Sequence, residues 1–78
     1  MRGYSHNNPF QKERNILGDR IRNFREKKRM TQEDLADKAE IDVSYLAKIE
    51  NGYVNTTIRY LIKVSKALGV KAKDLLDF

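Results

Sequence analysis

The chain has 78 residues, a formal net charge of +5 and no cysteine. It can form one small domain without disulfides or a thiolate metal site, and such a domain is marginally stable because it buries only about 60% of its unfolded surface. No apolar run approaches the roughly 20 residues that span a bilayer, so we expect a cytoplasmic protein without a membrane partner.

Positive charge is concentrated at the two ends of the chain. Residues 1–30 carry nine Lys and Arg against three acids, residues 31–50 carry two against six, and residues 51–78 carry five against two. A basic balance favours a polyanionic partner such as nucleic acid or an anionic membrane surface. Solvated lysines on helix surfaces would produce the same total, so charge alone does not identify the partner.

The first residues show no hydrophobic periodicity. We interpret residues 1–13 as a flexible N-terminal arm, whose opening MRGYSHNN resembles an expression-vector leader, and residues 14–78 as the folded domain. His6, the single histidine, lies in this arm. A histidine-based metal site or acid–base site is therefore not expected.

A first helix is predicted from Ile16, because Leu17, Ile21 and Phe24 recur at helical spacing between polar residues. The basic run 27–29 favours the end of this helix, where the helix dipole attracts cations.

A second helix is predicted to begin after Thr31, whose hydroxyl can accept a free backbone N–H. Asp34, three residues on, completes a shortened capping box. The buried face of this helix is expected to consist of Leu35, Ala36 and Ala39.

A third helix is predicted to follow after a short turn, with Asp42 as its cap. Leu46 and Ile49 lie one turn apart on its buried side. Asn51-Gly52 ends it with the residue pair that best accepts a left-handed turn.

Two further helices complete the prediction. Thr56 or Thr57 caps a fourth helix, which ends at Gly69 and buries Leu61, Ile62, Val64 and Leu68. A short fifth helix contains Leu75 and Leu76. Since the sequence shows neither strand-like alternation nor an internal repeat, the predicted fold class is all-α, with five short helices.

The second and third helices have the spacing of a helix-turn-helix: two helices of about eight residues joined by a three-residue turn. Ala36 lies where they cross, at a position where a larger side chain would push them apart. With Leu46 and Ile49 facing inward, the outward residues of the third helix are Val43, Ser44, Ala47 and Lys48. A protruding helix of this kind can enter the major groove of DNA.

Four different fragments follow one another along the chain in a particular order and spacing: Leu17…Ile21…Arg25, Thr31-Gln32-Glu33-x-Leu35-Ala36, Tyr45-Leu46-x-x-Ile49-Glu50-Asn51-Gly52, and Leu61…Ala67-Leu68-Gly69-Val70…Leu75-Leu76. Together they resemble the phage repressor and Cro-like helix-turn-helix family, also called the XRE family, over residues 17–76. The resemblance implies a five-helix, lambda-repressor-like DNA-binding domain with residues 43–50 as the recognition helix.

The resemblance also implies roles for individual residues. The base-facing positions of the family match Val43, Ser44, Ala47 and Lys48. Gln32 matches a glutamine that bonds a phosphate and braces the start of the recognition helix. Asn51 matches a phosphate contact, to which we add Tyr53, Asn55 and Arg59. Further attraction for phosphates is expected from basic residues on the flanks, among them Arg20, Arg22 and Lys28.

Arg25 and Glu50 match a structural ion pair of the family that ties the first helix to the third. The sequence departs from the family pattern at Glu40, where the turn usually has glycine, and at Thr56, which replaces a common proline. Asp42 lies at the edge of the proposed groove contact. It can either cap the recognition helix or accept a bond from a cytosine amino group.

The implied function is sequence-specific binding of double-stranded DNA by a transcriptional repressor, acting as a homodimer on a palindromic operator. The expected contact between copies is the apolar C-terminal set Val70, Leu75, Leu76 and Phe78. The alternative is an antitoxin or co-regulator whose main partner is another protein. No enzymatic activity, catalytic residue, cofactor, metal or small-molecule ligand is expected, because the chain lacks a nucleophile–base pair and a phosphate-binding glycine loop.

Overall fold

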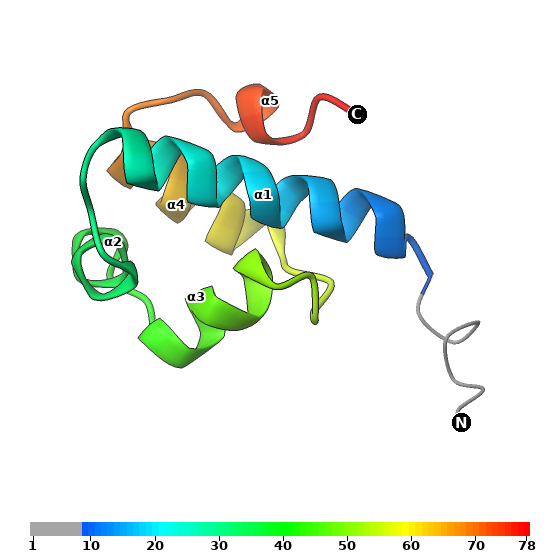
Figure 1. Ribbon diagram of the computed structural model, residues 1–78, viewed down its shortest axis with the longest axis horizontal. Helices are drawn as coiled ribbons and strands as arrows, with labels where there is room; N and C mark the ends of the chain where they lie inside the picture. Colours follow the sequence, from blue (N-terminus) through cyan, green and yellow to red (C-terminus); the bar gives the residue numbers. More distant parts are fainter. Residues whose placement is uncertain (1–8) are drawn as a thin grey trace.

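The computed structural model describes residues 9–78, which form five α-helices and no strand (Figure 1). In chain order these are α1 (Gln11–Lys27), α2 (Gln32–Ala39), α3 (Val43–Glu50), α4 (Ile58–Leu68) and α5 (Ala72–Leu75). The predicted all-α fold is confirmed. Within residues 9–78, no helix combines the length and apolar character needed to cross a membrane.

Helix α1 begins earlier than its apolar pattern indicates. Residues 11–13, which the sequence analysis assigns to the arm, form its first turn, and residues 1–8 of that arm lie outside the described residues. The extra turn is held by a tertiary contact, because Gln11 Nε2 donates a hydrogen bond to the carbonyl oxygen of Gly52 at 2.9 Å. Because the partner lies 41 residues away in the chain, the local hydrophobic pattern does not predict this contact.

Side-chain caps fix the start of three helices. Thr31 and Asp34 form the predicted capping box of α2, with both reciprocal hydrogen bonds present. The Asp42 carboxylate accepts the backbone N–H of Tyr45 at the start of α3. Of the two threonines proposed for α4, it is Thr57 that caps, through a bond from the backbone N–H of Tyr60.

The turn between α2 and α3 is built on a left-handed residue. Glu40 has φ 59° and ψ 48°, the conformation that glycine adopts without strain, and its N–H donates to the carbonyls of Ala36 and Asp37. A side chain in this conformation costs about 1–2 kcal/mol. The glutamate therefore keeps the helix-turn-helix geometry at some expense of stability.

The core consists of twelve buried apolar residues drawn from all five helices: Leu17, Ile21, Leu35, Ala36, Ala39, Leu46, Ile49, Leu61, Val64, Ala67, Leu68 and Leu75. The predicted inner face of α4 is wrong at Ile62, whose side chain is 42% exposed. Leu61, Val64 and Leu68 share one face at helical spacing, and Ile62 lies one residue round the helix from it. Ser65 takes the inward position and bonds the Ile62 carbonyl.

The helices are arranged about α1, which runs along the long axis of the molecule (Figure 1). In this view α5 lies above α1 and α3 lies below it, while α2 occupies one end. The start of α1, the α3–α4 loop and the C-terminal residues gather at the other end. This arrangement leaves one face of α3 outside the helical body.

Candidate nucleic-acid interface

Helix α3 presents one side to the core and one to solvent, as its sequence pattern predicts. Leu46 is fully buried and Ile49 is nearly so. On the opposite side, Val43, Ser44 and Lys48 are exposed and Ala47 is half-buried. The outward face is thus a row of small side chains with one lysine at its end, a shape that can approach base edges without steric obstruction.

Ser44 is tied to the cap of its own helix. Its hydroxyl donates to Oδ2 of Asp42, the oxygen that also accepts the N–H of Tyr45. Of the two roles considered for Asp42, this geometry supports capping. With its proton directed to Asp42, the Ser44 oxygen is left as an acceptor toward solvent, which suits an amino group on a base edge.

Glu50, the last residue of α3, is the centre of a buried polar cluster. Its carboxylate lies 2.8 Å from Nε and 3.0 Å from Nη2 of Arg25, so the ion pair implied by the resemblance is present and bidentate. The Glu50 side chain has no exposed surface. The hydrogen bond from the Arg25 guanidinium to this carboxylate raises the pKa of Arg25.

The pair is structural in character. It joins the last turn of α1 to the end of α3, and Arg25 also donates to the Met30 carbonyl at 2.8 Å. Removing one partner of a buried ion pair strands the other and costs about 3–5 kcal/mol. The cluster therefore holds α3 rigidly against the body while its outer face stays free.

Gln32 joins this cluster from the start of α2. Its side-chain amide donates to Glu50 Oε1 at 3.0 Å. The expected brace exists, but at the end of α3 and not at its start, because α2 and α3 cross so that the first residue of one meets the last residue of the other. Gln32 is half-buried, so a phosphate contact would come from the part of its amide that faces solvent.

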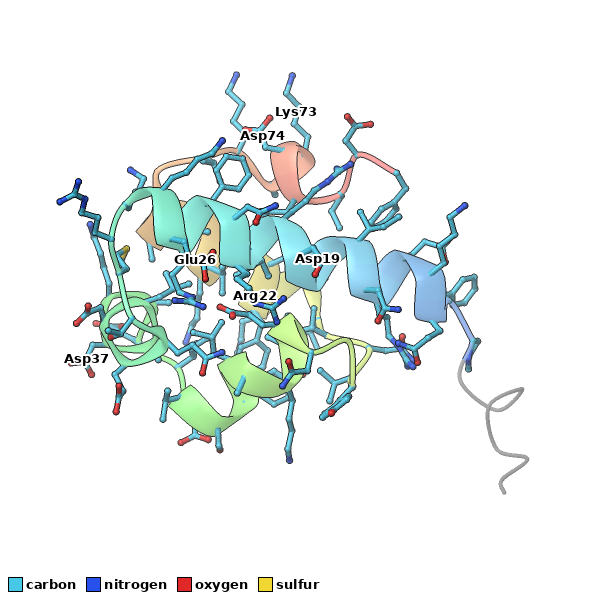
Figure 2. The ribbon with its side chains drawn as sticks, in the orientation of Figure 1. Asp19, Arg22, Glu26, Asp37, Lys73 and Asp74 are labelled. Atoms are coloured by element: carbon cyan, nitrogen blue, oxygen red, sulfur yellow. The ribbon has the colours of Figure 1, made fainter. Side chains whose placement is uncertain are left out.

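Arg22 takes a different place from the one expected on the flank. Its Nη2 donates to the Glu50 carbonyl at 3.1 Å and to Asn51 Oδ1 at 3.3 Å, while Nη1 lies 3.3 Å from Asp19. Figure 2 shows Arg22 reaching from α1 toward the end of α3. A cation here complements the negative end of the α3 dipole, so Arg22 orients Asn51 and the helix terminus.

Gly18 permits the close approach of α1 to α3 and was not singled out by the sequence analysis. A Cβ at this position would lie 2.7 Å from the Glu50 carbonyl carbon and 2.8 Å from the Ile49 oxygen, closer than side chains tolerate. A glycine in the interior of a helical pattern costs about 1 kcal/mol relative to alanine. That unexplained cost is the signal that could have marked it as a packing contact.

The first turn of α1 clamps the loop that follows α3. Gln11 Nε2 donates to the Gly52 carbonyl and to Asn15 Oδ1, at 2.9 and 2.8 Å. Gly52 is buried with φ 73°, and a Cβ there would collide with the Asn15 side chain. Gln11 and Asn15 carry no local signal of this contact, because Gly52 lies far along the chain.

The predicted phosphate-contact residues lie beyond this clamp. Asn51, Tyr53, Asn55 and Arg59 are all exposed, and Tyr53 has 71% of its surface accessible. Its backbone N–H bonds the Lys48 carbonyl, which holds the loop against the end of α3. Asn51 and Tyr53 therefore lie at the end of α3, next to Lys48, while Asn55 lies farther along the loop and Arg59 on α4.

Tyr45 connects α3 to α4. Its ring lies 4.5 Å from that of Tyr60, centroid to centroid, and its hydroxyl donates to Thr56 at 3.4 Å. Thr56, which stands where proline is common in the family, therefore helps to position the loop through its side chain.

The C-terminal residues expected to join two copies do not form one surface. Leu75 has no exposed surface and belongs to the core, and Val70 packs against that core. Leu76 and Phe78 are exposed, at 36% and 60%. The prediction is therefore wrong for Leu75, because the last short helix must bury one leucine to dock on α1 and α4.

Comparisons with known proteins agree with this geometry. The helix-turn-helix family matches residues 21–75. The control protein C.BamHI from Bacillus amyloliquefaciens is 42% identical over 64 residues, which are 81% of this chain and 79% of that protein. The immunity repressor protein of Bacillus phage phi105 is 37% identical over 60 residues, 77% of this chain and 42% of the repressor.

Among solved structures, the restriction-modification controller protein C.AhdI from Aeromonas hydrophila is similar with a TM-score of 0.80 at 30% identity. The match covers 82% of this chain and 97% of that chain. The chain therefore belongs to the helix-turn-helix family of transcription regulators, of the phage repressor and Cro-like (XRE) type, and not to a family of enzymes.

Proposed function

We propose that this protein is a transcriptional repressor that binds a palindromic DNA operator as a homodimer, with α3 in the major groove. The observation that carries the proposal is the two-sided character of α3. Its inner side is fixed by Leu46, Ile49 and the Glu50 cluster, and on its outer side Val43, Ser44 and Lys48 are exposed.

Base contacts and phosphate contacts are assigned to different residues. We assign base edges to Val43, Ser44, Ala47 and Lys48, and phosphates to Gln32, Asn51, Tyr53, Asn55 and Arg59. Phosphate contacts supply most of the affinity of such proteins, whereas base contacts supply the sequence choice. A nearly uncharged reading face is therefore compatible with a chain whose net charge is +5.

A homodimer follows from the small reach of one recognition helix. Two copies related by a two-fold axis read half-sites about 34 Å apart, and the long axis of this molecule measures 37 Å. Two copies joined end to end along that axis would have their centres at a comparable separation. Repression is favoured because a small domain can block transcription simply by occupying a promoter. We place the protein in the cytoplasm.

The test is the salt dependence of DNA binding, measured by fluorescence anisotropy on duplexes recovered from a random pool. A dimer that touches about six phosphates gives a slope of about −5 for log affinity against log salt. A slope near zero, or failure to enrich any duplex, would contradict the proposal. That outcome would favour the alternative of an antitoxin or co-regulator whose main partner is a protein.

A repressor role is tested separately with a reporter gene placed behind the enriched sequence. Expression of the protein should lower reporter output, and a Lys48→Ala protein should lower it less. Increased output would assign the protein to activators while leaving its DNA binding intact.

A further inference from the structure

A polar hollow lies between α1 and the end of α3, beside the surface proposed to contact DNA. Its volume is about 300 Å³, and all five residues that line it are polar or charged: Asn15, Asp19, Arg22, Glu50 and Asn51. Figure 2 shows Asp19 and Arg22 on α1, with Arg22 extending toward the end of α3. Since Asn51 is one of the proposed phosphate contacts, its neighbours in the hollow decide what else can bind there.

The hydrogen bonds around Asn51 leave its amide nitrogen free. Arg22 Nη2 lies 3.3 Å from Asn51 Oδ1. A guanidinium group only donates, so it must face the oxygen of the amide. Nδ2 of Asn51 is therefore turned away from Arg22, and it makes no hydrogen bond within residues 9–78. Because Asn51 is exposed, this nitrogen is available as a donor to another molecule.

The amide of Asn15 is oriented in a similar way, through Gln11. Arg14 Nη2 donates to Gln11 Oε1, so the Gln11 nitrogen faces the Gly52 carbonyl and Asn15 Oδ1. The reverse orientation of the Gln11 amide is excluded, because arginine has no acceptor and a carbonyl has no donor. With its oxygen bonded to Gln11, the exposed Asn15 also keeps a free nitrogen, which has no acceptor in the part of the chain that the structure describes.

We propose that the Nδ2 groups of Asn15 and Asn51 bind one phosphate of the DNA backbone between them, which makes Asn15 a further phosphate contact. The inference rests on the proposed DNA binding and adds a residue to it. Asn51 directly follows α3, so a phosphate at the edge of the groove that α3 occupies meets Asn51 and the hollow together. Side-chain amides are among the groups that commonly bond phosphates at protein–DNA interfaces.

The charges on the lining suit a phosphate that belongs to a bound duplex. The Glu50 carboxylate is fully buried and paired with Arg25, and Asp19 is paired with Arg22 at 3.3 Å. The hollow therefore offers neutral donors and little net charge, which gives a free phosphate ion little reason to leave water. A phosphate of a duplex that α3 already holds arrives at a high effective concentration instead.

The test measures the affinity for a selected half-site duplex in which one phosphate at a time is replaced by an uncharged methylphosphonate. For the wild type, replacement at the position that faces the hollow should weaken binding about tenfold, as expected for hydrogen bonds to a charged group. Asn15→Ala should weaken binding to the native duplex similarly, and should respond less than about threefold to that replacement. Asn51→Ala should lose its response at the same position.

A second variant tests the orienting role of Gln11 with Asn15 left in place. Gln11→Glu keeps the length of the side chain and gives Arg14 a carboxylate, but it has no donor for Asn15 Oδ1 or the Gly52 carbonyl. The Asn15 amide should then turn its nitrogen toward this carboxylate. Binding to the native duplex should weaken, and the response to methylphosphonate should be lost at the position that Asn15→Ala identifies.

Controls separate this contact from folding and from charged contacts. Asn23→Ala changes an exposed asparagine of α1 that lines a different hollow, and should alter neither affinity nor response. Circular dichroism reports whether each variant folds. Because an amide is neutral, Asn15→Ala should keep the slope of log affinity against log salt, whereas Arg59→Ala should reduce its magnitude by about 1. A reduced slope for Asn15→Ala would overturn its assignment as a neutral donor.

Inorganic phosphate is the probe for the other source of the same chemistry. Added to the free protein, it should leave the side-chain amide resonances of Asn15 and Asn51 unshifted. A shift of both resonances would make free phosphate the occupant of the hollow and overturn its assignment to the DNA backbone.

The outcomes distinguish this inference from the proposed function. If the wild type binds the duplex and no phosphate position is coupled to Asn15, the Asn15 contact is overturned and the proposed function stands. Coupling of Asn15 and Asn51 to different positions overturns the shared phosphate. If the wild type enriches no duplex, the proposed function fails and this contact fails with it.

Discussion

Gly18 lies where the backbone of α1 meets the last carbonyls of α3, with no room for a methyl group. We expect Gly18→Ala to lower the free energy of unfolding by about 1–3 kcal/mol, because the neighbours that must move are backbone atoms. The gain in helix propensity of about 1 kcal/mol offsets only part of this. Urea denaturation measures the difference.

The matched control for this prediction is Asn23→Ala, an exposed site in the same helix, which should be neutral or slightly stabilising. If Gly18→Ala behaved like Asn23→Ala, α1 and α3 would be farther apart in solution than this packing requires.

The carboxylate of Asp34 makes the free energy of unfolding depend on pH in the acid range. The backbone N–H of Thr31, and then its hydroxyl, hold the pKa of this carboxyl below its ordinary value. A depressed folded-state pKa contributes stability above the unfolded-state pKa of about 3.9, and this contribution is lost as pH falls through the folded-state value. Asp34→Asn should therefore destabilise the protein at pH 7 and have a smaller effect at pH 2.

Urea denaturation at the two pH values provides the measurement, with Asp37→Asn as the control. Asp37 is exposed in the same helix, and its carboxylate accepts no hydrogen bond within residues 9–78. An Asp34→Asn effect of equal size at both pH values would show that the cap does not depend on the charge of the carboxylate.

Substitutions on and beside helix α3 should affect the affinity for DNA and the preference for a DNA sequence separately. Lys48→Ala should change the sequence recovered from a random duplex pool, since a base contact is worth about 1–3 kcal/mol of discrimination. Gln32→Ala should weaken binding to all duplexes alike, because Gln32 bonds the Glu50 carboxylate and is assigned to a phosphate. Sequencing of the bound pools and anisotropy titrations measure the two effects.

Lys66→Ala, an exposed substitution on α4, should change neither the pool nor the affinity by a comparable amount. A Lys48→Ala protein that recovers the wild-type sequence with lower affinity throughout would reassign Lys48 to phosphate binding.

The sequence predicts most elements because their signals are local. The caps at Thr31 and Asp42 and the turn at Asn51-Gly52 are specified by neighbouring residues, and all three are present. The start of α1 is not predicted, because it depends on the bond from Gln11 to Gly52, whose partner is placed only by the tertiary fold.

At the scale of the whole molecule, the sequence does not predict which side chains of the C-terminal region stay exposed after the helices pack together. Leu75 and Leu76 look alike in the chain, but the docking of α5 buries the first and exposes the second. Arg14 reads as an ordinary polar residue of an amphipathic helix. Only the assembled end of the molecule, with Phe10 and Phe78 around it, shows that its charge is enclosed.

The outer row of α3 stands apart from the bonds that hold the helix in place. Val43 and Lys48 do not belong to the core, so replacing them removes little packing. Glu50 has no such freedom, since two arginines and a glutamine converge on it. A descendant of this protein could therefore change its target by a few substitutions on one side of a single helix while inheriting the scaffold unaltered.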